Sequence, residues 1–63
     1  MTQKELLYVE DAIGHEQSII KICNAAINSL KDDNLVSFMK KEVRKHTNMQ
    51  ELLLKLLEDK INE

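Results

Sequence analysis

Two carboxylates and one imidazole occupy positions where the hydrophobic pattern of this chain predicts apolar side chains. Glu16 lies in an apolar repeat between residues 3 and 31, and Glu42 and His46 are four residues apart in a second repeat, 34–61. Carboxylate and imidazole groups together suit iron, manganese or zinc. Helical bundles build di-metal centres from such groups, so a metal site of Glu16, Glu42 and His46 is one interpretation.

Two other interpretations of these side chains stay open. An unpartnered carboxylate on an apolar face is costly, so it must be solvated, neutralised or paired. A Glu–His or Glu–Lys pair would set the register of two helices without any chemistry, and a wide bundle interior would hold water beside these groups. His15 follows Gly14 at the flank of the same face and is expected at the surface or at an interface.

The first repeat predicts a long amphipathic helix. Thr2 and Glu5 have the spacing of a capping box, in which a hydroxyl and a carboxylate each satisfy a free backbone N–H. Residues then recur alternately three and four apart, which is the spacing of a heptad seam. The seam positions are Leu6, Val9, Ile13, Glu16, Ile20, Cys23, Ile27 and Leu30.

The segment "KDDN" (31–34) interrupts this pattern. Asp32 or Asp33 is expected to cap a second helix, because a short carboxylate accepts bonds from the first free N–H groups. The apolar positions of that helix are predicted to be Leu35, Val36, Met39, Val43, His46, Met49, Leu53, Leu56 and Leu57.

These elements make one all-α domain that spans residues 1–63. We expect a helix over about 3–31, a turn at 32–33 and a helix over about 34–61. A turn this short makes the two helices antiparallel neighbours. With the turn at 32–33, Glu16 and His46 would differ in height by about 5 Å, within reach of each other.

The leucines at 52–57 spread over roughly 200° of the helix surface, more than one neighbouring helix covers. A second copy is the simplest cover, so the sequence predicts a homodimer that closes a four-helix bundle. The residues predicted to form its interface are Ile20, Cys23, Ile27, Met39, Met49, Leu53, Leu56 and Leu57.

Composition excludes several kinds of partner. The net charge of −2, with both signs interspersed, and the presence of only one Tyr, one Phe and no Trp argue against nucleic acid. The longest apolar run is three residues, far short of a membrane span. A lone cysteine and the lack of a signal-peptide pattern favour a cytoplasmic protein. No catalytic triad, phosphate-binding loop or CxxC pair is present, so no catalytic residue or organic cofactor is predicted.

Three segments carry a resemblance to a known family: "ELLYVEDAIGHEQ" (5–17), "DDNL" (32–35) and "KKEVRKH" (40–46). The chain resembles the ferritin-like superfamily reduced to half a bundle, and more narrowly the small spore-coat proteins of the coat-F type. The resemblance implies that Glu16 corresponds to the metal ligand on the first helix of that family, and that His46 corresponds to the histidine of the motif on its second helix. Val43 stands where the family motif has a glutamate, which argues against oxidase or iron-storage activity. The resemblance to coat proteins implies a structural role in the spore coat, with other coat proteins as partners.

A second resemblance concerns the small helical phosphatases that act on response regulators. Gln50, Glu51 and Leu52 match part of their Ser-Gln-Glu-Leu-Asp motif, but Met49 precedes them and Leu53 replaces the aspartate. The favoured function is a non-enzymatic structural or interaction protein. The alternatives are a metal-binding ferritin-like protein and a regulatory hairpin that docks on a kinase or a response regulator.

Overall fold

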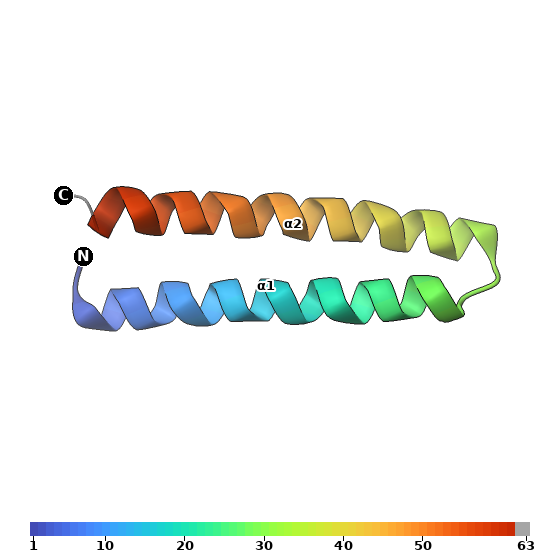
Figure 1. Cartoon of the computed structure of the whole chain (residues 1–63), viewed down its shortest axis with the longest axis horizontal. Coiled ribbons are helices and arrows are strands. Elements are labelled where there is room, and N and C mark those ends of the chain that lie inside the picture. The colour runs from blue at the N-terminus through green and yellow to red at the C-terminus, as the bar shows by residue number, and fades with distance from the viewer. Residues whose placement is uncertain (62–63) are drawn as a thin grey trace.

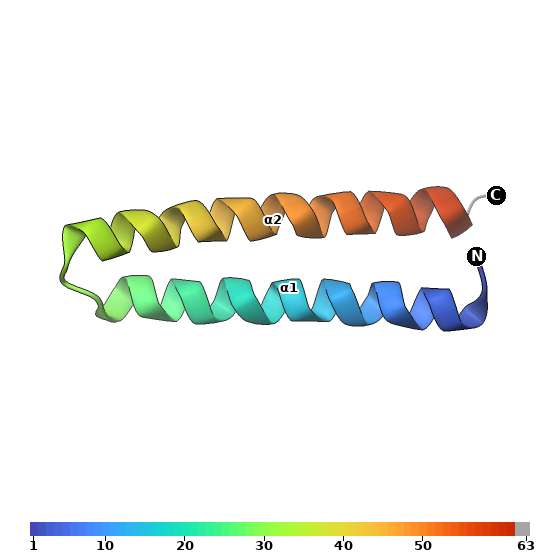
Figure 2. The ribbon, with the colours of Figure 1, turned by 180° about the vertical axis from the view of Figure 1, so that it is seen from behind.

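The structure, a computed structural model, describes residues 1–61 as two long helices that lie side by side. Helix α1 spans Gln3–Ser29 and helix α2 spans Asp33–Ile61. The two helices run in opposite directions, so the start of α1 and the end of α2 lie at the same end of the hairpin (Figures 1 and 2). The hairpin measures 47 × 15 × 11 Å, and the predicted all-α antiparallel hairpin is confirmed. Within residues 1–61, neither helix has a stretch apolar enough to cross a membrane.

The first helix starts with the predicted capping box. The backbone N–H of Thr2 donates to Oε1 of Glu5 at 2.7 Å, and the backbone N–H of Glu5 donates to Oγ1 of Thr2 at 3.1 Å. Thr2 has extended backbone angles, as an N-cap residue must. Two free N–H groups at the helix start are thereby satisfied.

The turn lies earlier in the chain than the sequence predicted. Helix α1 ends at Ser29, and Leu30 is extended with φ −77° and ψ 142°, although its N–H still donates to the carbonyl of Ala26. Oδ1 of Asp32 accepts a hydrogen bond from the N–H of Leu35 at 3.0 Å, so Asp32 caps α2. An N-cap residue lies outside the helix, which is why α2 begins at Asp33 and the connection occupies residues 30–32.

The seam of α1 follows the predicted spacing. Cys23, 7% exposed, is the one buried residue in the described part of the chain, and the other predicted seam positions of α1 are half-buried. On α2 the half-buried seam positions are Val36, Met39, Val43, His46, Gln50, Leu53 and Leu57.

The seam of α2 corrects part of the prediction. Gln50, rather than Met49, continues the three–four spacing from Val36, and Met49 is exposed. Leu35 and Leu56 are exposed as well. Each of these three apolar residues stands one position before a seam residue, so helical geometry turns it about 100° away from the seam.

Candidate functional site

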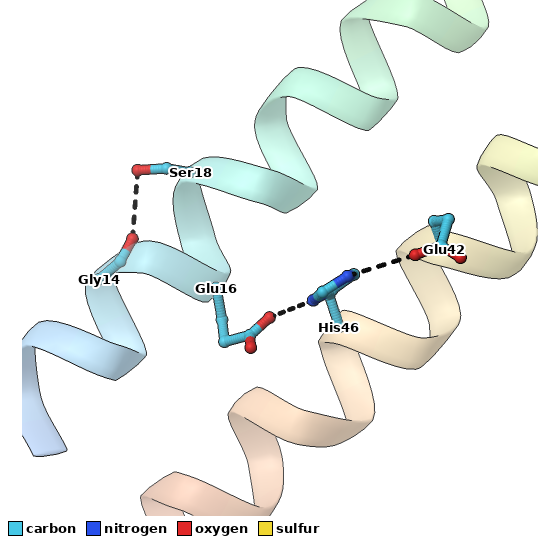
Figure 3. A network of polar contacts seen from close by, with 5 residues as sticks. All are labelled: Gly14, Glu16, Ser18, Glu42 and His46. Carbon is cyan, nitrogen blue, oxygen red and sulfur yellow. Dashed lines mark hydrogen bonds and ion pairs between the residues drawn. The ribbon is translucent and has the colours of Figure 1, made fainter.

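Three ionisable side chains, Glu16 and His46 of the seam and Glu42 beside it, come together at the middle of the hairpin. Glu16 is at the centre of α1 and His46 is one residue before the centre of α2. Glu42 lies one turn before His46 on α2. Figure 3 shows the imidazole of His46 lying between the two carboxylates, with Glu16 reaching across from the opposite helix.

The imidazole contacts one carboxylate through each ring nitrogen. Nδ1 of His46 is 2.5 Å from Oε2 of Glu16, and Nε2 is 3.3 Å from Oε2 of Glu42. The side chains of His46, Glu16 and Glu42 keep 17%, 13% and 27% of their surface exposed. Only the doubly protonated ring has an N–H on both nitrogens, so that form donates to both carboxylates at once. The arrangement is a partly covered Glu–His–Glu cluster that crosses the seam.

The direct contact between Glu16 and His46 corrects the predicted register. With the turn at 32–33, the two side chains were expected to differ in height by about three residues. Because the connection occupies 30–32, α1 is shorter than predicted and Glu16 stands level with His46. The buried-pair interpretation therefore has the geometry that it requires.

The same geometry bears on the predicted metal site. A metal ligand must offer a nitrogen lone pair, whereas each ring nitrogen of His46 faces a carboxylate and the two carboxylates lie on opposite sides of the ring. Over residues 1–61 no group of three or more His, Cys, Asp or Glu side chains is arranged to hold a metal ion. Binding of iron, manganese or zinc by Glu16, Glu42 and His46 stays a prediction that would require rotated side chains or ligands from a second copy.

Other candidate groups lie away from this cluster. His15 is exposed, as expected for a residue at the flank of the apolar face. Cys23 is a free thiol buried in the seam between the helices. Burial restricts its access to reagents and substrates, which suits a packing role.

The residues predicted as a dimer interface fall into two groups. The seam of the single hairpin already covers part of the surface of Ile20, Cys23, Ile27, Met39, Leu53 and Leu57. Met49 and Leu56 are exposed. They belong to a second row on α2, which we call the α2 row: Leu35, Phe38, Met49, Leu52 and Leu56.

The prediction of a single apolar face on the second helix combines the α2 row with the seam. Both follow the same three–four spacing, and the row is displaced from the seam by one residue. A three–four count that starts at Val36 gives the seam, and one that starts at Leu35 gives the α2 row, so two separate counts distinguish them. Between Phe38 and Met49, the same spacing places the charged residues Glu42 and Lys45 on this edge of α2.

Comparison with known protein families, with curated protein sequences and with solved structures gives no match. The geometry of the hairpin, its Glu–His–Glu cluster and its exposed apolar residues therefore carry the functional argument.

Proposed function

We propose that this chain is a non-enzymatic structural or interaction protein that works as a homo-oligomeric helical bundle. The observation that carries the proposal is the amount of surface that the hairpin leaves uncovered. The chain exposes 5085 Å², whereas a compact monomeric protein of 7.3 kDa exposes about 4,200 Å². The excess is close to the ~800 Å² that each partner covers in a stable interface.

The kind of surface that is exposed supports the same proposal. Single apolar side chains on a protein surface are ordinary, but the α2 row extends along most of a helix that is 29 residues long. Only Glu42 and Lys45 interrupt the row, and apolar side chains gathered along one edge of a helix in this way mark an interaction site. With only Cys23 buried among residues 1–61, one hairpin has little core of its own, and small domains of this size commonly gain stability by oligomerisation.

The resemblance to small spore-coat proteins adds a biological setting to this proposal. A coat protein requires surfaces that assemble, and it requires no catalytic centre. The Glu–His–Glu cluster then serves to set the register of the two helices, as buried polar groups do in some helical assemblies. Other coat proteins are the additional partners that this resemblance implies.

Sedimentation equilibrium combined with elemental analysis of protein purified without chelators tests the proposal. We expect a folded dimer or larger oligomer without stoichiometric metal. A compact, well-ordered monomer would contradict self-association. One or two metal ions per dimer, lost in Glu16→Ala, would instead favour the metal-binding ferritin-like alternative. A loosely folded monomer that becomes ordered on a kinase or response regulator would favour the regulatory hairpin.

A further inference from the structure

The two sides of the hairpin differ in chemistry. On one side, a groove of about 440 Å³ is lined by Glu5 and Tyr8 of α1 and by Leu56 of α2, among others. On the other side, Asn24 of α1 and Lys40 of α2 line a second groove. The α2 row and Tyr8 therefore share one side, and the polar residues of the second groove lie on the opposite side.

The side that carries the α2 row has a matching row on α1. Ala12 is one turn after Tyr8, and Ile19 and Ala26 follow at intervals of seven residues, so these side chains line the same edge of α1. All three are half-buried. We call Ala12, Ile19 and Ala26 the α1 row, and the two rows together the apolar face.

We infer that a second copy of this chain docks on the apolar face through its own apolar face, about a two-fold axis that crosses the helices at right angles, with Glu42 of each copy opposite Lys45 of the other. The inference rests on the proposed self-association and specifies its surface and geometry. A two-fold interface brings one patch against itself, so the patch must be complementary to its own reversed copy.

The α2 row meets this condition. At the three–four spacing, the first six positions along this edge of α2 are Leu35, Phe38, Glu42, Lys45, Met49 and Leu52. Read in either direction, they are two apolar residues, two residues of opposite charge and two apolar residues. When two such rows run antiparallel with their centres aligned, Leu35 meets Leu52, Phe38 meets Met49 and Glu42 meets Lys45. Apolar side chains then cover apolar side chains, and each charge at the centre meets its opposite.

The α1 row is symmetric about the same level of the hairpin. Its three half-buried members read the same in both directions about Ile19, which has an alanine seven residues away on each side; the exposed His15 and Ile22, which lie between them at the outer border of this edge, do not match each other. The contact between Glu16 and His46 sets the register, so Ile19, three residues after Glu16, is level with Val43, three residues before His46. The centre of the α2 row also lies beside Val43. One two-fold axis can therefore pass through the centres of both rows. The two alanines of the α1 row have small side chains, which leave room for close approach of the second copy.

An axis parallel to the helices is the other two-fold arrangement for this face. It would place α2 of one copy over α1 of the other, with Glu42 and Lys45 against the α1 row. Glu42 would keep its contact with His46, but the charge of Lys45 would be covered by apolar side chains without a facing carboxylate, which is costly. The crossing axis avoids that cost.

Two exposed leucines provide a matched test of the face. Leu52 is 67% exposed on the α2 row, and Leu54 is 47% exposed and lies two heptads after Lys40, on the other side of α2. We expect Leu52→Glu to weaken the dimer by about tenfold or more, because it places a carboxylate in the interface core. We expect Leu54→Glu to leave the dimer unchanged. Circular dichroism checks that both variants remain helical, and sedimentation measures association.

A charge exchange tests the axis. In homodimers of Lys45→Glu or of Glu42→Lys, like charges face each other twice. Glu42→Lys also removes the contact of Glu42 with Nε2 of His46, so Glu42→Gln, which loses the carboxylate without creating a facing like charge, is measured beside it and is expected to remain a dimer. A mixture of the two variants forms a heterodimer in which both facing pairs have opposite charge. We expect each variant alone to dissociate and the mixture to recover dimers. Lys41→Glu mixed with Glu51→Lys, at exposed positions outside the apolar face, provides the control for the same change in net charge.

The outcomes distinguish this inference from the proposed function. If the unmodified chain is a well-ordered monomer, self-association itself is wrong. If it is a dimer that Leu52→Glu leaves intact or Leu54→Glu disrupts, the proposed function stands and the apolar face is the wrong surface. If Leu52→Glu dissociates the dimer but the charge-exchanged mixture recovers no more than the control, the face is right and the crossing axis is wrong.

Discussion

Nδ1 of His46 lies 2.5 Å from Oε2 of Glu16, and this contact joins the centres of the two helices. Both residues occupy seam positions that apolar side chains would otherwise take. Because the contact spans 30 residues of sequence, it ties the height of α1 to the height of α2 at the middle of a long hairpin. The two symmetric rows of the apolar face depend on that register.

Removing one member of this pair should be more harmful than removing both. In His46→Leu, the carboxylate of Glu16, 13% exposed, loses its partner, and we expect the free energy of unfolding to fall by about 2 kcal/mol. In the double variant Glu16→Leu/His46→Leu, two leucines complete the seam, so we expect stability equal to or above that of the unmodified chain. Urea denaturation measures both. A His46→Leu variant of unchanged stability would show that the contact adds nothing.

Leu53 and Leu54 should respond differently to the same substitution. Leu53 is half-buried in the seam, whereas Leu54 is exposed. We expect Leu53→Asp to abolish both assembly and most of the helical circular dichroism, because long helices in water depend on packing of their apolar face. Leu54→Asp should retain the helical signal. A folded and dimeric Leu53→Asp variant would contradict the placement of Leu53 in the seam.

Gly14 should be replaceable with a gain in stability. It lies inside α1, where glycine is less favourable than alanine by about 1 kcal/mol. A Cβ atom built on Gly14 meets nothing within 4 Å, and the carbonyl that accepts the hydrogen bond from Oγ of Ser18 is retained (Figure 3). We expect Gly14→Ala to raise the free energy of unfolding by about 1 kcal/mol in thermal denaturation. Weaker association in this variant would show that a second copy approaches the glycine.

Acid should loosen the start of α1 by protonating Glu5. The backbone N–H of Thr2, and then its side chain, hold the pKa of the Glu5 carboxyl below its ordinary value. A lowered pKa in the folded state means that the stabilisation is present above the ordinary pKa and is lost as the pH falls through the lowered pKa. We expect the amide signal of Thr2 to shift with the titration of the Glu5 side chain in NMR spectra.

Substitution of Thr2 tests the cause of this shift. Thr2→Ala removes the hydroxyl of the capping box and should move the pKa of Glu5 back toward its ordinary value. Thr2→Ser retains the hydroxyl and should keep the pKa low. Equal titration curves in the two variants would show that the side chain of Thr2 makes no contribution.

Much of the hairpin could be predicted because helical spacing assigns side chains to faces without knowledge of the fold. The capping box of Thr2 and Glu5, the α1 seam and the capping role of Asp32 all rest on local rules of this kind. Met49 shows where such rules mislead. Hydrophobicity alone favours Met49 over the neighbouring Gln50 for the seam, although the unbroken heptad count gives that place to Gln50.

The sequence by itself determined that two amphipathic helices form, where each helix is capped, and that Glu16, Glu42 and His46 lie on faces with apolar neighbours. Only the tertiary structure decided that Glu16 stands level with His46 and that the apolar residues of α2 divide into a seam and an exposed row. The physical reason is that spacing along one helix fixes direction around its axis. The relative height of two helices depends on where the chain turns, and moving the turn from 32–33 to 30–32 moves one helix along the other by about three residues, or about 5 Å.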